Sequence, residues 1–103
     1  MLKVDDALKE LAQKSYVDIQ VETAWKWASR AAASYEALST EEDKKALLAS
    51  FMMAEEYFHE AMEHAALARD NILLQSIVNA VSPYEEKAAA HIHETFGSET
   101  SHD

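Results

Sequence analysis

A near absence of helix-breaking residues is the feature that most constrains how this chain of 103 residues can fold. It contains one Gly, Gly97, and one Pro, Pro83, and these two residue types interrupt helices more strongly than any others. Ala, Glu, Leu and Lys, which are good helix formers, are plentiful along the sequence. The sequence therefore predicts a single all-α domain.

The composition narrows the class of protein further. The chain has no Cys, which excludes a disulfide framework and a thiolate metal site. Lys and Arg number 9 against 19 Asp and Glu, a formal net charge of −10. This balance argues against nucleic acid and anionic membranes as partners and would attract cations. No apolar run approaches the ~20 residues of a membrane span, and the N-terminus lacks the apolar core of a signal peptide. We therefore expect a cytoplasmic protein.

The first helix boundary is predicted from a capping box, in which a Ser or Thr is followed three residues later by Glu or Gln. Ser39 and Glu42 have this spacing, so a first helix is expected over about 5–38 and a second helix after the box. Asp70 and Asn71 are poor helix-interior residues and allow a kink or break in the second helix. The two helices should form an antiparallel hairpin.

A second capping box marks the last predicted helix. Ser82 and Glu85 have the same spacing, and Pro83 would occupy the first helical position, where its missing N–H costs nothing. The second helix should therefore end just before Ser82. The short C-terminal helix that follows should end at Gly97, since Gly is a common helix stop.

The first helix carries apolar residues on two nearly opposite sides. One stripe consists of Leu8, Leu11, Ala12, Ile19, Ala33 and Ala37, and the other of Val17, Val21, Trp25, Ala28, Ala32 and Tyr35. A hairpin partner can cover only one side, and a helix that is apolar on both sides is normally buried on both. Because so short a chain has few other elements, the sequence predicts a homo-oligomer, at least a dimer, in which two hairpins pair into a four-helix bundle.

The strongest candidates for chemistry are Glu22 in the first helix and a Glu-x-x-His in the second, Glu56 and His59. Both lie roughly 25–30 Å from the predicted turn at ~1.5 Å per residue, and so at one level of the hairpin. A Glu from one helix and a Glu-x-x-His from its neighbour make half of a di-iron carboxylate site. Two copies would complete it, with iron as the expected metal and manganese or zinc as substitutes.

Glu55 and Glu63 are second choices as metal ligands. By helical spacing Glu55 projects nearer the centre of the apolar face than Glu56 does. Either Glu55 binds the metal with His59 one turn further on, or the face is rotated toward Glu56, which we prefer because of the motif. Glu63 lies on the same side as His59 and is a candidate for an additional or entry-site ligand. Two further side chains expected to point outward are Glu60 and His64.

The hairpin with Glu22, together with the stretch 54–65 that contains Glu56 and His59, resembles half of a ferritin or rubrerythrin bundle. The most similar architecture is that of the encapsulated ferritin family, whose members are short chains of two long helices and a short C-terminal helix. The resemblance covers residues 5–96 in helix order. It implies ferroxidase sites between subunits of a ring-shaped decamer, with the two Glu and the His as iron ligands.

The C-terminal residues differ from that family. Its members usually end in a Gly-Ser-Leu-type peptide that docks into a protein shell, and residues 97–103 lack the Leu and the basic residues of this peptide. The resemblance therefore does not imply an encapsulin shell as a partner. We expect residues 98–103 to be a disordered polar tail and residues 1–97 to be the single ferritin-like domain.

Two functions compete on this sequence. The first is a homo-oligomeric ferroxidase that oxidises Fe(II) at a di-iron site between two subunits, for iron storage or detoxification. The alternative is a non-catalytic helical oligomer that acts as an interaction or scaffold module, with the same Glu and His side chains merely solvated. A hydrolase is not supported, because the chain has no Gly-rich phosphate loop and no Cys nucleophile.

Overall fold

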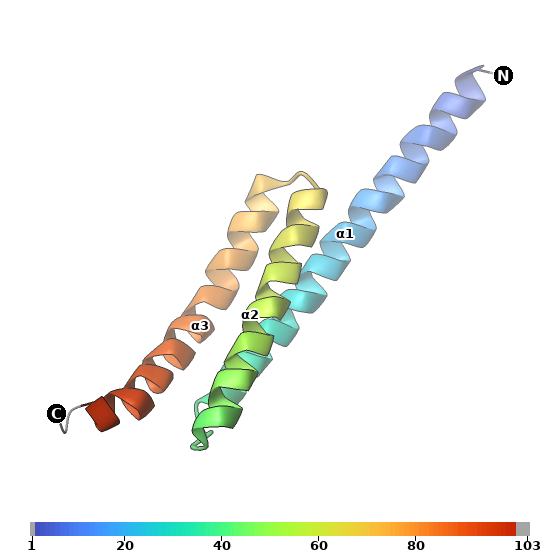
Figure 1. Cartoon of the computed structure of the whole chain (residues 1–103). Coiled ribbons are helices and arrows are strands. Elements are labelled where there is room, and N and C mark those ends of the chain that lie inside the picture. Colours follow the sequence, from blue (N-terminus) through green and yellow to red (C-terminus); the bar gives the residue numbers. More distant parts are fainter. Residues whose placement is uncertain (1, 101–103) are drawn as a thin grey trace.

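The computed structural model describes residues 2–100, with side chains described for residues 7–97. Its three helices are α1 (Leu2–Leu38), α2 (Lys44–Leu67) and α3 (Asn71–Thr100), and every pair of them is in contact. Figure 1 shows α2 returning alongside α1 and α3 returning alongside α2, while the N-terminal part of α1 extends beyond the α2–α3 turn. The all-α prediction and the antiparallel hairpin are confirmed for the described residues.

The turn between α1 and α2 uses a different cap from the one predicted. Asp43 is the N-cap of α2, and its Oδ2 accepts a hydrogen bond of 3.0 Å from the backbone N–H of Ala46. Ser39 instead donates its hydroxyl to the carbonyl of Glu36 at 2.8 Å, which satisfies the C-terminal end of α1. The predicted capping box at Ser39 is therefore wrong. Asp is as good an N-cap as Ser, and its charge is favourable at a helix N-terminus.

The second break lies at residues 68–70 and not before Ser82. Arg69 has φ of 56°, the left-handed conformation that ends many helices. Asp70 then caps α3, because its Oδ1 accepts from the N–H of Leu73 at 3.0 Å. The capping box at Ser82 is wrong, and the C-terminal helix is 30 residues long and contains Pro83 in its interior. An interior Pro costs ~3 kcal/mol, and we attribute its tolerance here to burial on both sides of it, at Val81 and Ala88.

The end of α3 also differs from the prediction. The helix continues past Gly97 to Thr100, so the Gly does not act as a stop. Three of the residues assigned to the polar tail are therefore helical in backbone, and residues 101–103 lie outside the described part of the chain.

The core between the helices is built largely from Ala, which lets the helix axes approach closely. Larger side chains fill the remaining space around these faces. The buried residues of α1 and α2 include Ala24, Ala28, Ala31, Tyr35, Leu47, Ala54, Phe58, Ala61 and Ala65, and those of α3 include Leu73, Ile77, Val81 and Ala88. The third helix thus belongs to the same core as the hairpin. It is a full structural element and not a short appendage.

The two apolar stripes of α1 have different environments. Ala28 and Tyr35 of the second stripe are buried, and Val21 packs against the core. Residues of the first stripe remain exposed, with Leu8, Leu11 and Ile19 at 58% to 61%. The premise that the chain has too few elements to cover the second stripe is wrong, because α3 contributes to the same core. The first stripe is the one left without a cover inside the described chain.

We predict that Asp43→Ala destabilises the protein by about 0.5–2 kcal/mol because the first turn of α2 loses its cap. Ser39→Ala should change stability by much less, since its hydroxyl serves only an exposed carbonyl at the end of α1. Urea denaturation of both variants, with Asp43→Asn as the conservative control, measures the difference. Equal losses in the two Ala variants would contradict the assignment of the cap.

Candidate functional site

The structure does not gather the predicted ligands within one chain. Glu22 and Glu56 are exposed, and the side chain of His59 is 67% exposed, with its Nε2 3.0 Å from Glu63 Oε1. Among the described residues, no group of three His, Asp or Glu side chains is placed to hold a metal. A site built on Glu56 and His59 therefore requires groups from outside this chain.

The register of the hairpin explains the separation of Glu22 from the motif. Trp27 of α1 lies against Tyr57 of α2, with ring centroids 5.5 Å apart, and Gln20 contacts His64. The same register places Glu22 level with Met62. Glu56 is then about 9 Å further along the helix axis at ~1.5 Å per residue. The sequence-based estimate missed this offset because the real turn ends at Asp43 rather than at Ser39.

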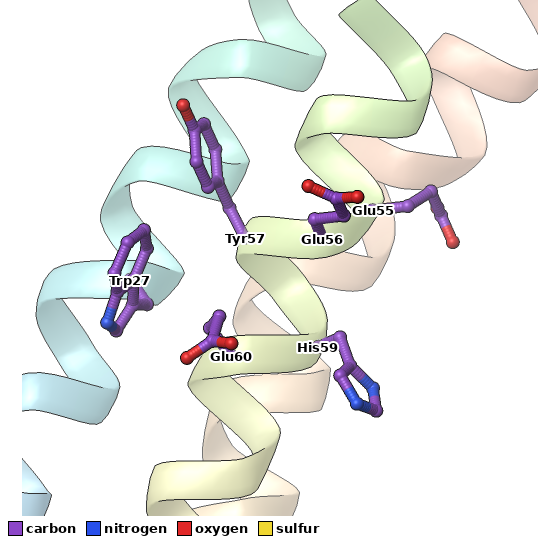
Figure 2. Close-up of a pocket in the computed structure, with 6 residues that line it drawn as sticks. All are labelled: Trp27, Glu55, Glu56, Tyr57, His59 and Glu60. Atoms are coloured by element: carbon purple, nitrogen blue, oxygen red, sulfur yellow. The ribbon is translucent and has the colours of Figure 1, made fainter.

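An open hollow of about 810 Å³ surrounds the motif on α2. It is lined by Trp27, Glu55, Glu56, Tyr57, His59 and Glu60. Figure 2 shows that these side chains fan out around the helix: Glu60 lies on the Trp27 side, and Glu55 and His59 lie on the other. The hollow therefore presents carboxylates and one imidazole toward solvent. It is an acidic outer face that a second molecule can reach.

Glu55, the second choice of the sequence analysis, points in a different direction from Glu56. Its Oε1 accepts a hydrogen bond of 2.5 Å from the hydroxyl of Tyr35, and the Oε2 of Glu85 lies 3.4 Å from the same hydroxyl. The Tyr35 side chain is buried, with Phe51 and Phe58 packed edge-on against its ring. One side chain from each of the three helices thus meets at this point. We call Tyr35, Glu55 and Glu85 the carboxyl seam.

The carboxyl seam changes the protonation of Glu85. The hydrogen bond to Glu55, then burial, then repulsion by the Glu55 charge raise the pKa of Glu85 from 4.5 to about 7, against a smaller lowering effect of Tyr35. Burial, followed by the bond to Glu55, raises the pKa of Tyr35 well above its ordinary value. Near neutral pH the two carboxyl groups therefore share a proton for much of the time.

A second polar contact joins α1 to α2 further along the hairpin. His64 donates from Nδ1 to Oε1 of Gln20 at 2.5 Å, and its Nε2 lies 3.6 Å from Glu60 Oε2. The expectation that His64 points outward is therefore wrong, because its ring lies over the hairpin interface. This contact satisfies the buried amide of Gln20, and we assign it a structural role.

Sequence reasoning missed Glu85 and the role of Tyr35. Glu85 was interpreted as a capping residue of a new helix, which removed it from consideration as an inward side chain. Had α3 been extended backwards from Ala88, helical spacing through Ile77 and Val81 would have placed Glu85 at the edge of the apolar face.

Comparison of the chain with protein-family models, with curated proteins and with solved structures gives no match. None of the three described helices is long and apolar enough to cross a membrane. The functional assignment therefore depends on the residues themselves.

We predict that Glu85 makes folding stability fall as pH rises. The folded state holds the Glu85 proton up to about pH 7, whereas the ordinary value is 4.5. The folded state thus binds more protons in this window, and the contribution of Glu85 is complete below it and lost above it. Glu85→Gln should remove this part of the pH dependence when urea denaturation is repeated across the window. Glu94→Gln, an exposed change on the same helix, is the control and should retain it.

Proposed function

We propose that this chain is a ferritin-like, ferroxidase-type iron protein in which two copies together form a di-iron carboxylate site. The observation that carries the proposal is the outer face of α2. There Glu56 and His59 are exposed within one helical turn, and Glu63 lies against the His59 ring. Both motif residues are accessible to a second copy, which is what an intersubunit site requires.

The contact between Glu63 and His59 supports a metal-binding role for the imidazole. Histidines that bind metals commonly use one ring nitrogen for the metal and hold the other against a carboxylate or carbonyl. Here Nε2 contacts Glu63, which leaves Nδ1 for a metal. Carboxylates with one imidazole per metal suit iron and manganese. When bound, the metal pair supplies the redox chemistry, and the chain supplies ligands and their orientation.

A second copy is required because one chain provides too few converging ligands. Two copies double Glu56 and His59, and the remaining carboxylates come from Glu22, Glu55 or Glu63, of which Glu63 is already beside the imidazole. Met52 continues the outer face of α2 and is 67% exposed. Burial of such apolar surface between copies favours association at ~25 cal/mol per Å². A ring of subunits, as the resemblance implies, would repeat this contact.

We predict that Glu56→Ala and His59→Ala each abolish Fe(II) oxidation without loss of helix content, because they remove exposed ligands and no core packing. Glu63→Ala should reduce the rate about 10–100-fold, the usual effect of removing a residue that orients a ligand. Glu94→Ala, remote on α3, is the control. Oxidation followed by absorbance and Fe(II) binding by calorimetry measure the effects. Wild-type rates in His59→Ala would refute the proposal.

The same experiment identifies the remaining carboxylate. Loss of oxidation in Glu22→Ala would show that a partner brings that residue to the site, and loss in Glu55→Ala would show that the inward carboxylate binds metal. Fe(II), Mn(II) or Zn(II) should also raise the melting temperature of the parent chain, since a ligand that binds only the folded state stabilises it. Equal melting curves with chelator and with metal would count against a metal site.

A second candidate function, a helical interaction module, is favoured by the N-terminal part of α1. All described residues from 7 to 19 are exposed, among them Leu8, Leu11 and Ile19. Pocket-forming side chains of α1 and of the α2 end lie beside this segment, including Tyr16 and Leu67. A partner helix, from this chain or another, would cover them without any metal.

We predict that the parent chain is oligomeric and that Leu8→Glu with Leu11→Glu weakens its self-association. Each buried Leu contributes roughly 1.5–3 kcal/mol, so the dissociation constant should rise more than tenfold. Gln13→Glu adds a charge nearby without removing apolar surface and serves as the control. Light scattering with dilution measures the change. A folded parent chain that is monomeric at micromolar concentration would remove both the intersubunit site and this module.

A further inference from the structure

Pro83 divides α3 into two halves. It has no N–H, so the helix lacks the bond that residue 83 would otherwise donate to the carbonyl of Asn79. Kinks and bends in helices concentrate at such positions. The part after the Pro, residues 84–97, can therefore tilt relative to residues 71–82 at a lower cost than elsewhere in α3. We call residues 84–97 the arm.

Few contacts hold the arm on the hairpin. Ala88 is buried at 1% exposure, and Ile92 and Phe96 pack against the core. The ring of His91 donates from Nε2 to the backbone carbonyl of Glu41 at 2.8 Å. Apart from these contacts near the α1–α2 turn, the attachment closest to the Pro is Glu85 in the carboxyl seam. The state of that one group therefore bears directly on whether the arm stays in place.

The attachment at Glu85 depends on a proton. The single hydroxyl proton of Tyr35 is donated to Glu55 at 2.5 Å, and the Glu85 carboxyl is more distant at 3.4 Å. The groups that act on Glu85 are Glu55 of α2, Tyr35 of α1 and Glu86 of its own helix, and all are acidic. A protonated Glu85 donates to Glu55, whereas an ionised Glu85 faces another carboxylate and is repelled.

We propose that the arm is a proton-controlled lid, hinged at Pro83, that lies on the hairpin while Glu55 and Glu85 share a proton and lifts when the proton is lost. Lifting uncovers apolar surface at the end of the hairpin near the α1–α2 turn, where Ala88 packs. The raised pKa of Glu85, about 7, puts this change within the range of ordinary cellular pH. The inference rests on the seam and the hinge and is independent of the iron proposal.

The absence of Cys from the chain allows a direct test. Ala88→Cys places a single thiol under the arm, and Ala90→Cys places one on its exposed side. The ratio of their reaction rates with a thiol reagent cancels the intrinsic effect of pH on thiol ionisation. We expect the ratio of the Ala88→Cys rate to the Ala90→Cys rate to rise on the order of tenfold from about pH 5.5 to about pH 8.5.

Glu85→Gln distinguishes the lid from a merely structural contact, because its amide donates to Glu55 at every pH. In this background the ratio should stay low and flat, whereas Glu94→Gln should leave the rise unchanged. Hydrogen exchange of residues 84–97 against 71–81 in the Cys-free chain gives a second readout if Ala88→Cys packs poorly. A ratio that does not change with pH, or an equal rise in Glu85→Gln, overturns the proposal.

Discussion

The whole structure depends on close packing between Ala-lined helix faces. Buried Ala residues on α1 and on α2, such as Ala28 and Ala61, let the two helices approach without large side chains between them. So narrow a hairpin buries little apolar area by itself, and burial at ~25 cal/mol per Å² then falls short of the entropy of ordering the chain. The third helix supplies the rest with Ile77 and Val81, which are almost completely buried. The bundle is therefore a three-helix unit.

Packing of α3 on the hairpin determines where the charges of the chain lie. Consecutive residues of a helix project about 100° apart, so Glu55 and Glu56 face different surroundings. Glu55 is drawn into the seam between helices, where Tyr35 donates to it. Glu56 remains on the outer face beside His59. One helix thus provides a proton-sharing contact on its inner side and a set of free metal-ligand types on its outer side.

The sequence predicts the all-α class, the first helix and the antiparallel hairpin because these follow from composition and period alone. It misplaces the two later boundaries because a capping box is only a local signal. Ser39 satisfies the end of α1 instead of the start of α2, and the helix runs through Ser82 because burial at Val81 and Ala88 outweighs the cost of Pro83. Glu85 was lost to the site for the same reason, since a wrong boundary gave it a capping role.

The two faces of α2 are linked by electrostatics. A metal cation held by Glu56 and His59 would place positive charge within one residue of Glu55. That charge favours the ionised forms of Glu55 and Glu85 and so opposes the shared proton of the carboxyl seam. Linkage requires the reverse effect as well: loss of the proton, which frees negative charge near the outer face, strengthens cation binding by the same factor. If both proposals hold, metal uptake and lifting of the arm favour one another, and the size of that coupling is set by how far the charge at Glu56 is screened from the carboxyl seam.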